Sequence, residues 1–580
     1  MNQATSPKWL LWQIFAFRAL SLLKPIRYSI LVTSFLFYGG NTAFAQAIDS
    51  ATAKKIDGQF LQIKKTSPGC AIGIVRNDTL IYAKGYGLAN LEYGVPINTR
   101  TIFEMGSISK QFTAYAILLL ARQGKLSIDD DIHKYLSWLP DFGKKICISN
   151  LLYHTSGIRD YDQLLAMVGT TQEDVITREH LIKILSRQQT LNFVPGEQYM
   201  YSNSGYFLLG EIVRAVTGES LRQFTDSAIF KPLGMNSTNF HDDYTEMVPN
   251  RAYPYVQANT MGIINSSVVG AKGLFTSIDD MSKWAINFFN SKSESYQIIA
   301  QMMQSGKLNS GKETGVGAGL QTDDYRGLKM YLHGGINGGY NNFIMFLPEV
   351  KMAFFIFSNA GNSNYAGKTT HVADLFIKDT RPEKEKPGFK TPFDPIVKDT
   401  TSVQPLLGSY VVDDGDHTAF KLKDRKFYYV LNGRQTFILY RTERDTFWFR
   451  GFYPGIKFVF TVKNAHNVTV TQTWPDGRSR TMRKRDPFNT PADKQLMAYA
   501  GKYYCSELEC SYGIILKDHQ LVLTNAKYPD SPLVFYSPTR MINTLDWMKS
   551  LDFTKDKKGK ITGFDVNYNL VQDVRFEKIE

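Results

Sequence analysis

Apolar residues recur at two different spacings in the first two thirds of the chain. Continuous apolar runs predict strands at residues 70–76 and 79–84 and again near residues 331, 342 and 353. Between them, apolar positions three and four residues apart predict helices, and a further helix is expected from Ile48 to Lys65. Strands at both ends of this region favour a sheet that is closed by its first and last strands and flanked by helices.

The pattern changes after residue 380. Residues 381–400 are rich in proline and charged side chains, which is typical of a linker. Short runs rich in Tyr, Phe, Val and Thr follow, and Leu407-Gly408-Ser409-Tyr410 recurs as Ala500-Gly501-Lys502-Tyr503. We therefore predict two small all-β, antiparallel barrel-like domains at residues 401–487 and 494–580.

The first 45 residues have the features of an export signal. Basic residues precede an apolar run from Tyr28 to Tyr38, and Ala43-Phe44-Ala45 has the small-x-small pattern of a cleavage site. The run is shorter than the ~20 residues of a spanning helix. We expect cleavage after Ala45, no stable membrane span afterwards, and a periplasmic or secreted protein. The alternative is a chain held at the membrane by an uncleaved N-terminal segment.

Net charge and cysteine usage restrict the partners only in part. The formal net charge is +13, of which residues 381–580 carry +8. No basic stripe with interleaved aromatic residues occurs, so nucleic-acid binding is not expected. Four cysteines fit an oxidising compartment, and Cys505 and Cys510 are close enough in sequence for a bridge within one hairpin; the sequence leaves that pairing open. It leaves the oligomeric state open as well.

A candidate nucleophile lies in Gly106-Ser107-Ile108-Ser109-Lys110, ahead of a long apolar run. If a helix begins at Ser107, the Lys110 amine lies beside the Ser107 hydroxyl, because positions i and i+3 share a face. A buried lysine has a lowered pKa and can take the proton of a serine hydroxyl. Free N–H groups at the helix N-terminus stabilise an oxyanion. The S-x-x-K spacing alone is common, and an ordinary surface Ser and Lys is the alternative.

Two later stretches make the hydrolase interpretation specific. Tyr201-Ser202-Asn203 precedes an apolar helix, and His333-Gly334-Gly335-Ile336 leads into a strand-like run. Together with Ser107-x-x-Lys110 and in this order, they resemble the motifs of the serine β-lactamase and penicillin-binding protein superfamily. The Tyr-x-Asn triplet resembles the class C branch, which includes D-aminopeptidases, D,D-peptidases and esterases. The segments around His154-Thr155-Ser156-Gly157 and Ala271-Lys272-Gly273-Leu274 also resemble that group.

The resemblance implies a fold and a role for each motif residue. It implies an α+β catalytic domain at residues 46–380, with an antiparallel sheet flanked by helices and an all-helical lobe. By the same resemblance, Ser107 is the nucleophile, Lys110 handles its proton, and Tyr201 is a second base whose phenolate Lys110 favours. Support for substrate comes from Asn203, His333 and Gly335, and the oxyanion hole from the backbone N–H groups of Ser107 and Ile336. No metal or organic cofactor is implied.

Departures from the family pattern bear on the substrate. His333 replaces a lysine and is mostly neutral at pH 7, and Gly334 replaces a threonine that contacts a substrate carboxylate in many members. We therefore expect a serine hydrolase acting on D-amino-acid amides, peptides or esters, with small molecules or peptides, including peptidoglycan-derived ones, as partners. The alternatives are a true β-lactamase or D,D-carboxypeptidase, and a non-catalytic envelope binding protein.

Overall fold

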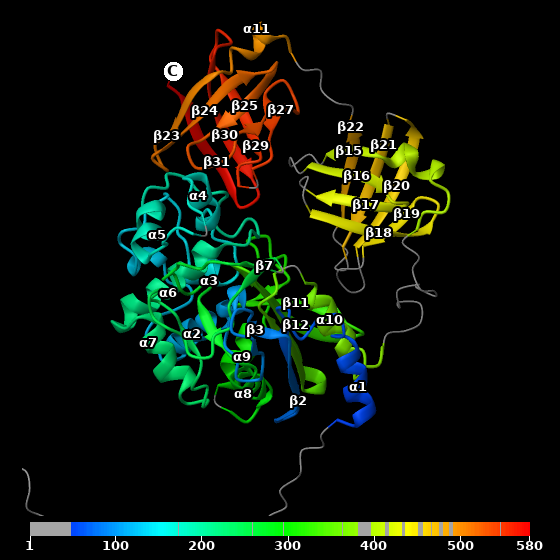
Figure 1. Ribbon diagram of the computed structural model, residues 1–580. Helices are drawn as coiled ribbons and strands as arrows, with labels where there is room; N and C mark the ends of the chain where they lie inside the picture. The colour runs from blue at the N-terminus through cyan, green and yellow to red at the C-terminus, as the bar shows by residue number, and fades with distance from the viewer. Residues whose placement is uncertain are drawn as a thin grey trace, which may run out of the picture. The chain divides into compact units, whose positions relative to one another are not determined.

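The computed structural model describes residues 48–579 with a few gaps, and Figure 1 labels its elements. The gaps are residues 172, 258, 294, 362, 466 and 546 and the segments 381–395, 412–416, 432–434, 450–455, 475–478 and 486–490. The predicted export segment and most of the predicted linker therefore lie outside the described residues.

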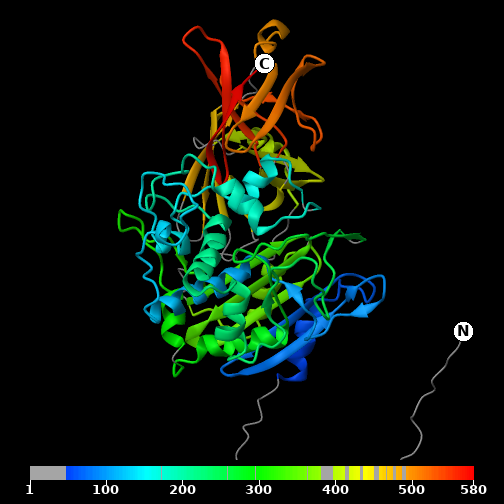
Figure 2. The ribbon, with the colours of Figure 1, turned by 90° about the vertical axis from the view of Figure 1, so that its left-hand side faces the viewer.

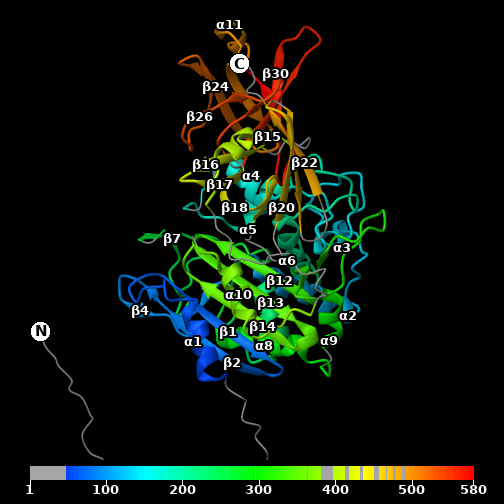
Figure 3. The same ribbon diagram turned by 90° about the vertical axis from the view of Figure 1, so that its right-hand side faces the viewer.

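The region before residue 380 is built on a seven-stranded antiparallel sheet with the order β10-β11-β12-β13-β14-β1-β2. The strand that comes first in the sequence, β1, pairs with the strand that comes last, β14, and Cys70 lies opposite Ser358. The prediction of a sheet that joins both ends of the region is thus confirmed (Figure 3). The strands are β1 Cys70–Arg76, β2 Thr79–Tyr86, β10 Val316–Gly317, β11 Leu320–Tyr325, β12 Leu328–Asn337, β13 Tyr340–Leu347 and β14 Met352–Ser358.

Helices cover both faces of this sheet, which explains why its central strands are apolar throughout. Alternate residues of β1 enter two different clusters of buried side chains: Ala71 and Val75 join one, and Ile72 and Ile74 join the other. The second cluster includes Ile56 of α1 (Ser50–Gly58) and residues of α10 (Tyr365–Ala373). The first includes α2 (Lys110–Arg122) and α8 (Ile278–Phe289), and the domain is therefore two layers of helices around a sheet.

The first helix is shorter than the sequence predicts. We expected it to run from Ile48 to Lys65, but α1 ends at Gly58. Glycine is among the weakest helix formers, and the chain turns after it. The turn buries Phe60, whose ring stacks on Tyr86 at a centroid distance of 4.4 Å. Burial of an aromatic ring against the sheet therefore replaces two further helical turns.

A helical lobe lies in sequence between the two groups of sheet strands (Figure 2). Its interior contains Trp284, which is fully buried against Phe112 and Tyr115 of α2. The other helices are η1 Gly106–Ser109, η2 Ile132–Lys134, α3 Ile148–Leu152, α4 Tyr161–Met167, α5 Arg178–Leu185, α6 Asn203–Thr217, α7 Leu221–Thr225, η3 Asp226–Phe230, α9 Tyr296–Met302 and η4 Pro348–Val350. Short strands add β3 Leu88–Asn90, β4 Val95–Pro96, β5 Phe103–Glu104, β6 Asn239–Phe240, β7 Tyr255–Gln257, β8 Thr260–Met261 and β9 Leu274–Thr276.

The first β region is a closed eight-stranded barrel with its own core. Phe420, Phe427, Phe458 and Phe460 contact one another inside it. A short helix, η6 (Thr401–Leu406), precedes it. Its strands are β15 Gly408–Val411, β16 His417–Lys423, β17 Lys426–Leu431, β18 Gln435–Glu443, β19 Thr446–Phe449, β20 Ile456–Asn464, β21 Asn467–Thr473 and β22 Ser479–Arg485.

The second β region is a nine-stranded antiparallel sheet, which we call the C-terminal sheet. Cys505 and Cys510 lie opposite each other on β23 and β24, and both are free thiols. The region comprises α11 Asp493–Leu496, β23 Gly501–Cys505, β24 Cys510–Lys517, β25 Gln520–Thr524, β26 Ser531–Pro532, β27 Val534–Phe535, β28 Arg540–Ile542, β29 Ser550–Lys555, β30 Ile561–Tyr568 and β31 Val571–Lys578.

The buried side chains of the C-terminal sheet belong to the same cluster as those of the helical lobe. The barrel core forms a cluster of its own. Among the described residues, no helix combines the length and apolar character needed to cross a membrane.

Candidate active site

Ser107 lies in the second position of a tight helical turn. The predicted first helical turn exists, but η1 (Gly106–Ser109) has the 3₁₀ form, and the α-helix α2 begins at Lys110. The turn needs a glycine at its start because Gly106 has φ +53°, where a side chain is strained. A Cβ there would also lie 2.7 Å from the Ile336 nitrogen. Ser107 thus lies in a turn that packs directly on the third motif, His333-Gly334-Gly335-Ile336.

The Lys110 side chain is completely buried and points at Ser107. Its Nζ donates hydrogen bonds to Ser107 Oγ at 3.1 Å, to Asn203 Oδ1 at 2.8 Å and to the Ala271 carbonyl at 2.9 Å. Burial, helped by the nearby Lys272 cation, lowers the pKa of Lys110 to about 7. A substantial fraction of this amine is therefore neutral near pH 7 and able to accept a proton.

Tyr201 lies just before α6 and Asn203 is the first residue of that helix, so the triplet stands at a helix start as the sequence predicts. Ser202 caps the helix by accepting a hydrogen bond from the Gly205 nitrogen, which sets its two neighbours at the helix entrance. The Tyr201 hydroxyl donates to Ser107 Oγ at 2.8 Å, and Asn203 Oδ1 accepts from Lys110. The structure therefore brings Ser107, Lys110, Tyr201 and Asn203 together.

The protonation state of Tyr201 differs from the expectation of a phenolate. Burial raises the pKa of Tyr201 well above its usual value, and the nearby Asp160 and Asp162 charges act in the same direction. The hydroxyl also serves as donor toward Ser107. Tyr201 is therefore a neutral phenol in the resting site, and Lys110 is the better base.

The third motif lies on β12, next to the Ser107 turn. A Cβ on Gly335 would lie 1.9 Å from the Met105 carbonyl oxygen, so only glycine allows this close approach. The approach places the backbone of Gly335 and Ile336 against Gly106 and Ser107, as a shared oxyanion hole requires. His333 is buried, its Nδ1 lies 2.6 Å from the Gly334 carbonyl, and burial lowers its pKa to about 4. His333 is thus neutral at pH 7.

Three charged residues support the motif, and the sequence did not single them out for this role. Asp160 Oδ2 accepts from the Asn203 nitrogen at 2.6 Å, and Asp162 Oδ2 accepts from Asn203 Nδ2 at 3.0 Å. Lys272 in turn donates to Asp162 at 2.9 Å. Asp160 and Asp162 follow the resembling segment at His154, and Lys272 belongs to the one at Ala271, but side-chain partners so distant in sequence leave no spacing signal.

A cavity of about 520 Å³ lies beside these residues. Its wall includes Asp162, Lys272 and Gly273 from the first 380 residues and Tyr528 and Trp547 from the C-terminal sheet. Its volume lies within the range of ligand sites, but Ser107, Lys110 and Tyr201 are not among its wall residues.

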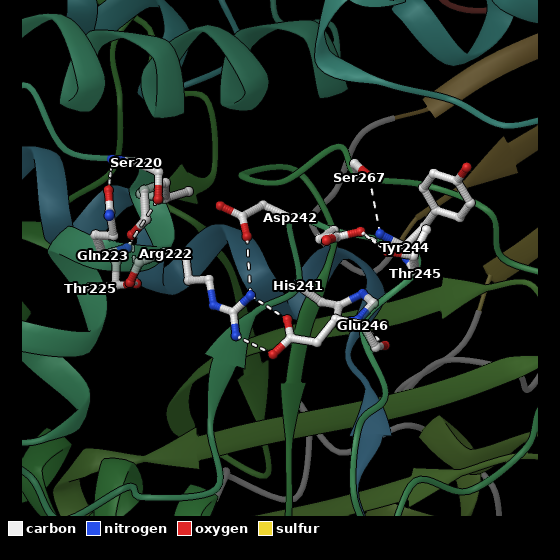
Figure 4. A network of polar contacts seen from close by, with 12 residues as sticks. Ser220, Arg222, Gln223, Thr225, His241, Asp242, Tyr244, Thr245, Glu246 and Ser267 are labelled. Atoms are coloured by element: carbon white, nitrogen blue, oxygen red, sulfur yellow. Dashed lines mark hydrogen bonds and ion pairs between the residues drawn. The ribbon is translucent and has the colours of Figure 1, made fainter. Parts of the chain in front are cut away.

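Figure 4 shows a network of polar contacts that includes His241, a residue of the cavity wall. The lining residue His241 has its Nε2 3.0 Å from the Glu246 carbonyl. The Glu246 carboxylate is paired with Arg222, which also contacts Asp242 at 3.3 Å. In the part of the chain that the structure describes, no group of three His, Cys, Asp or Glu side chains is arranged to hold a metal.

Fold and site together define a β-lactamase-type serine hydrolase. Residues 44–376 match the family model described as Beta-lactamase, which is more than half of the chain, and the protein belongs to this family. It is similar to penicillin-binding protein 4* of Bacillus subtilis, with 24% identity over 65% of this chain and 87% of that protein.

A D-aminopeptidase and a solved structure extend the comparison. The D-aminopeptidase of Gluconobacter oxydans is 25% identical over half of this chain, which spans only 56% of that protein. An octameric penicillin-binding protein homologue from Pyrococcus abyssi is 25% identical and has a TM-score of 0.52. The match covers 74% of this chain and 99% of that one.

Proposed function

We propose that this protein is an exported hydrolase that forms an acyl-enzyme with D-amino-acid amides, peptides or esters. One observation carries the proposal: Ser107 Oγ is shared between a buried Lys110 amine with a lowered pKa and the Tyr201 hydroxyl. A serine held by a base and by a second proton donor is an activated nucleophile. The relatives named D-aminopeptidase support the substrate class.

Acylation follows from these contacts. The neutral Lys110 amine takes the Ser107 proton while Oγ forms a bond to the substrate carbonyl carbon. The carbonyl electron pair moves to oxygen, where the N–H groups of Ser107 and Ile336 stabilise it; one such donor is typically worth ~3 kcal/mol. On collapse, the bond to the leaving group breaks. Tyr201 gives its proton to that group and takes the one held by Lys110. In the second half-reaction, Lys110 takes a proton from water while the water oxygen forms a bond to the acyl carbon. The bond to Ser107 Oγ then breaks, Oγ takes the proton back, and the acid is released.

The third motif favours a substrate without a carboxylate next to the scissile bond. His333 is neutral at pH 7, and Gly334 supplies no hydroxyl. A carboxylate there lacks the charge-assisted hydrogen bonds that usually hold it. This supports an aminopeptidase, amidase or esterase over an efficient β-lactamase or a D,D-carboxypeptidase.

Export is proposed on the sequence of the first 45 residues alone. The basic start, the short apolar run and Ala43-Phe44-Ala45 fit a cleaved signal and a periplasmic or secreted enzyme. Detection of the uncleaved chain in a membrane fraction would contradict this part of the proposal and favour an anchored protein.

The first test is a comparison of acyl donors with the chain lacking residues 1–45. D-alanine p-nitroanilide, short p-nitrophenyl esters and a fluorescent penicillin are offered to the unchanged protein and to Ser107→Ala. We expect turnover of the first two and a loss of at least 1000-fold in Ser107→Ala. Ser109→Ala is the control, because its hydroxyl lies in the same turn but accepts from the Leu274 nitrogen. The Ser109→Ala variant should still be labelled covalently by the fluorescent penicillin.

Other outcomes separate the alternatives. Faster turnover of a penicillin or cephalosporin than of any amide or ester would identify a β-lactamase. Neither turnover nor labelling with any donor would contradict the hydrolase and favour the binding protein.

A further inference from the structure

Residues 159–163 connect the second motif, Tyr201-Ser202-Asn203, to the C-terminal sheet. The segment follows the His154 turn and opens α4, so its backbone runs along the entrance of α6, where Asn203 lies. It contacts the tip of the β30–β31 hairpin, residues 568–573, on its other side. Arg159 and Asp160 take part in both sets of contacts.

Arg159 makes the central contact with the C-terminal sheet. It is 1% exposed, and its Nη1 lies 2.6 Å from Glu507 Oε2. Its Nε and Nη2 donate to the carbonyls of Gln572 and Asp573, both at 2.9 Å. Gln188 and Thr190 accept two further bonds at 3.0 and 2.6 Å. A buried guanidinium is tolerated only when it is paired and fully hydrogen-bonded, so this contact fixes Arg159 in one place.

The hairpin tip holds the rest of the segment through its backbone. The Asp160 nitrogen donates to the Leu570 carbonyl at 3.3 Å. Gln163 accepts from the Leu570 nitrogen at 2.9 Å and donates to the Tyr568 carbonyl at 2.7 Å. Asn192 bonds the tip from a second side, to the Leu570 carbonyl at 3.0 Å and from the Gln572 nitrogen at 2.8 Å.

The same segment holds the second motif by its other polar groups. Asp160 and Asp162 bind the backbone and side-chain nitrogens of Asn203 at 2.6 and 3.0 Å. Ser204 donates to the Arg159 carbonyl at 2.6 Å and accepts from the Tyr161 nitrogen at 2.8 Å. Asn203 then accepts the bond from Lys110. Each step from Glu507 to the Lys110 amine is therefore a hydrogen bond or one residue of backbone.

We propose that Arg159 and Glu507 are positioning residues, through which the C-terminal sheet places Asn203 and the Lys110 amine for acylation. The proposal rests on the acyl-enzyme function above and adds a part of the chain to its site. The C-terminal sheet is then part of the catalytic unit, although the motifs all lie before residue 340.

The same turn of the C-terminal sheet offers a matched control. Glu509 also pairs with basic residues of the lobe, Arg187 and Lys183, but these side chains are partly exposed. Among the described residues, neither of them hydrogen-bonds to residues 159–163 or to Asn203. Glu507→Gln and Glu509→Gln thus remove one charge each from the same interface, but only the first change reaches the motif.

The test measures the full-length chain with its best ester or anilide substrate, well below the melting temperature of each variant. We expect Glu507→Gln to lower kcat at least tenfold with KM within twofold, and Glu509→Gln to stay within twofold of the unchanged protein in both. The acid limb of the kcat/KM profile should also move to lower pH in Glu507→Gln. The reason is that a displaced Asn203 no longer accepts from the Lys110 ammonium, which loses stabilisation.

A second variant covers the case in which Glu507→Gln does not fold. Asn192→Ala removes only a half-buried amide that holds the hairpin tip, and it should lower kcat and move the acid limb in the same direction. Lower thermal stability without a change in kcat or the acid limb in either variant would overturn the proposal. Equal effects of Glu507→Gln and Glu509→Gln would overturn it as well. Absence of Ser107-dependent turnover in the unchanged protein is a different result and contradicts the proposed function.

Discussion

At the residue scale, the site depends on one lysine that loses its proton near neutral pH. Burial and the Lys272 cation lower the Lys110 pKa to about 7, whereas Asp160, Asp162 and Glu104 raise it. Below this pH the amine is protonated and accepts no proton from Ser107. The acylation rate therefore falls as the pH decreases through 7 and reaches its full value above it. His333, with a pKa of about 4, adds no inflection between pH 5 and 8.

Lys272 provides a test of this balance. Lys272→Gln removes a cation that lowers the Lys110 pKa, and it deprives the Asp162 carboxylate of its cationic partner. Both effects stabilise the Lys110 ammonium, so the acid limb of kcat/KM should move up by roughly half a unit to one unit. Lys283→Gln serves as control, because it removes a lysine paired with Asp280 instead. A limb that stays in place in Lys272→Gln would contradict the role given to Lys272.

The sequence predicted Lys110 and Tyr201, which touch Ser107, and Asn203, which touches Lys110, but it missed the role of the charged residues behind Asn203. The short spacing of Ser107 and Lys110 places both on one face, and the resemblance supplied Tyr201 and Asn203. Asp160 and Asp162 meet Asn203, and Lys272 meets Asp162, only through folding of distant segments, and charged side chains of these types are common on any surface. The protonation of Tyr201 was also beyond the sequence, because it depends on burial.

At the element scale, the position of β12 against η1 depends on two residues without a side chain, Gly335 on the strand and Gly106 on the turn. Gly335 allows the strand to lie against the Met105 carbonyl, whereas the neighbouring Gly334 has no atom closer than 3.9 Å to a Cβ at that position. Two adjacent glycines of one motif therefore have different reasons to be there. One permits the contact of two elements, and at the other an added methyl group would meet only the Asn342 carbonyl and the Phe343 ring at ordinary contact distance.

These two glycines make a paired experiment. Gly335→Ala must move β12 away from η1 and separate the two N–H groups of the oxyanion hole, so we expect kcat/KM to fall by at least a hundredfold. Gly334→Ala should remain within about threefold, because the added methyl group meets only ordinary contacts. Circular dichroism checks that both variants are folded. Similar losses in both would show that the close approach at Gly335 is not what matters.

Most elements of the sheet were predictable from the sequence, but helix ends were less so. The runs at residues 70–76 and 79–84 give β1 and β2 because sheet strands covered on both faces are apolar along their length. The expected helix after Ile48 is cut short at Gly58 because Phe60 finds a place on Tyr86. That partner lies on a strand, and helical spacing carries no information about it.

At the scale of the whole molecule, the two β regions differ in how they are joined to the rest. The C-terminal sheet shares a buried cluster with the helical lobe, whereas the barrel has a separate core. The internal repeat predicted two similar β domains, but it gave no sign of this difference. Contacts between residues 159–163 and the hairpin tip join positions about 400 residues apart, and no local pattern encodes them.

This difference predicts two thermal transitions. Phe420→Ala in the barrel core should lower the temperature of one transition, because loss of the ring costs ~3–5 kcal/mol of unfolding free energy, and it should leave catalytic activity unchanged. Phe564→Ala in the C-terminal sheet should lower the other transition, the one at which activity is lost. Differential scanning calorimetry with parallel activity measurements distinguishes them. A single transition lowered by both substitutions would mean that the barrel does not unfold as a separate unit.

The pairing of β1 with β14 also determines when, during synthesis of the chain, the central sheet can form. β1 forms its hydrogen bonds with a strand that is synthesised about 280 residues later, so the central sheet and the Ser107 turn packed on it stay incomplete until then. Pairing over such a distance is slow. A growing chain of this kind keeps the apolar strand β1 without its partner until β14 is made, and apolar strands exposed in this way are prone to aggregate.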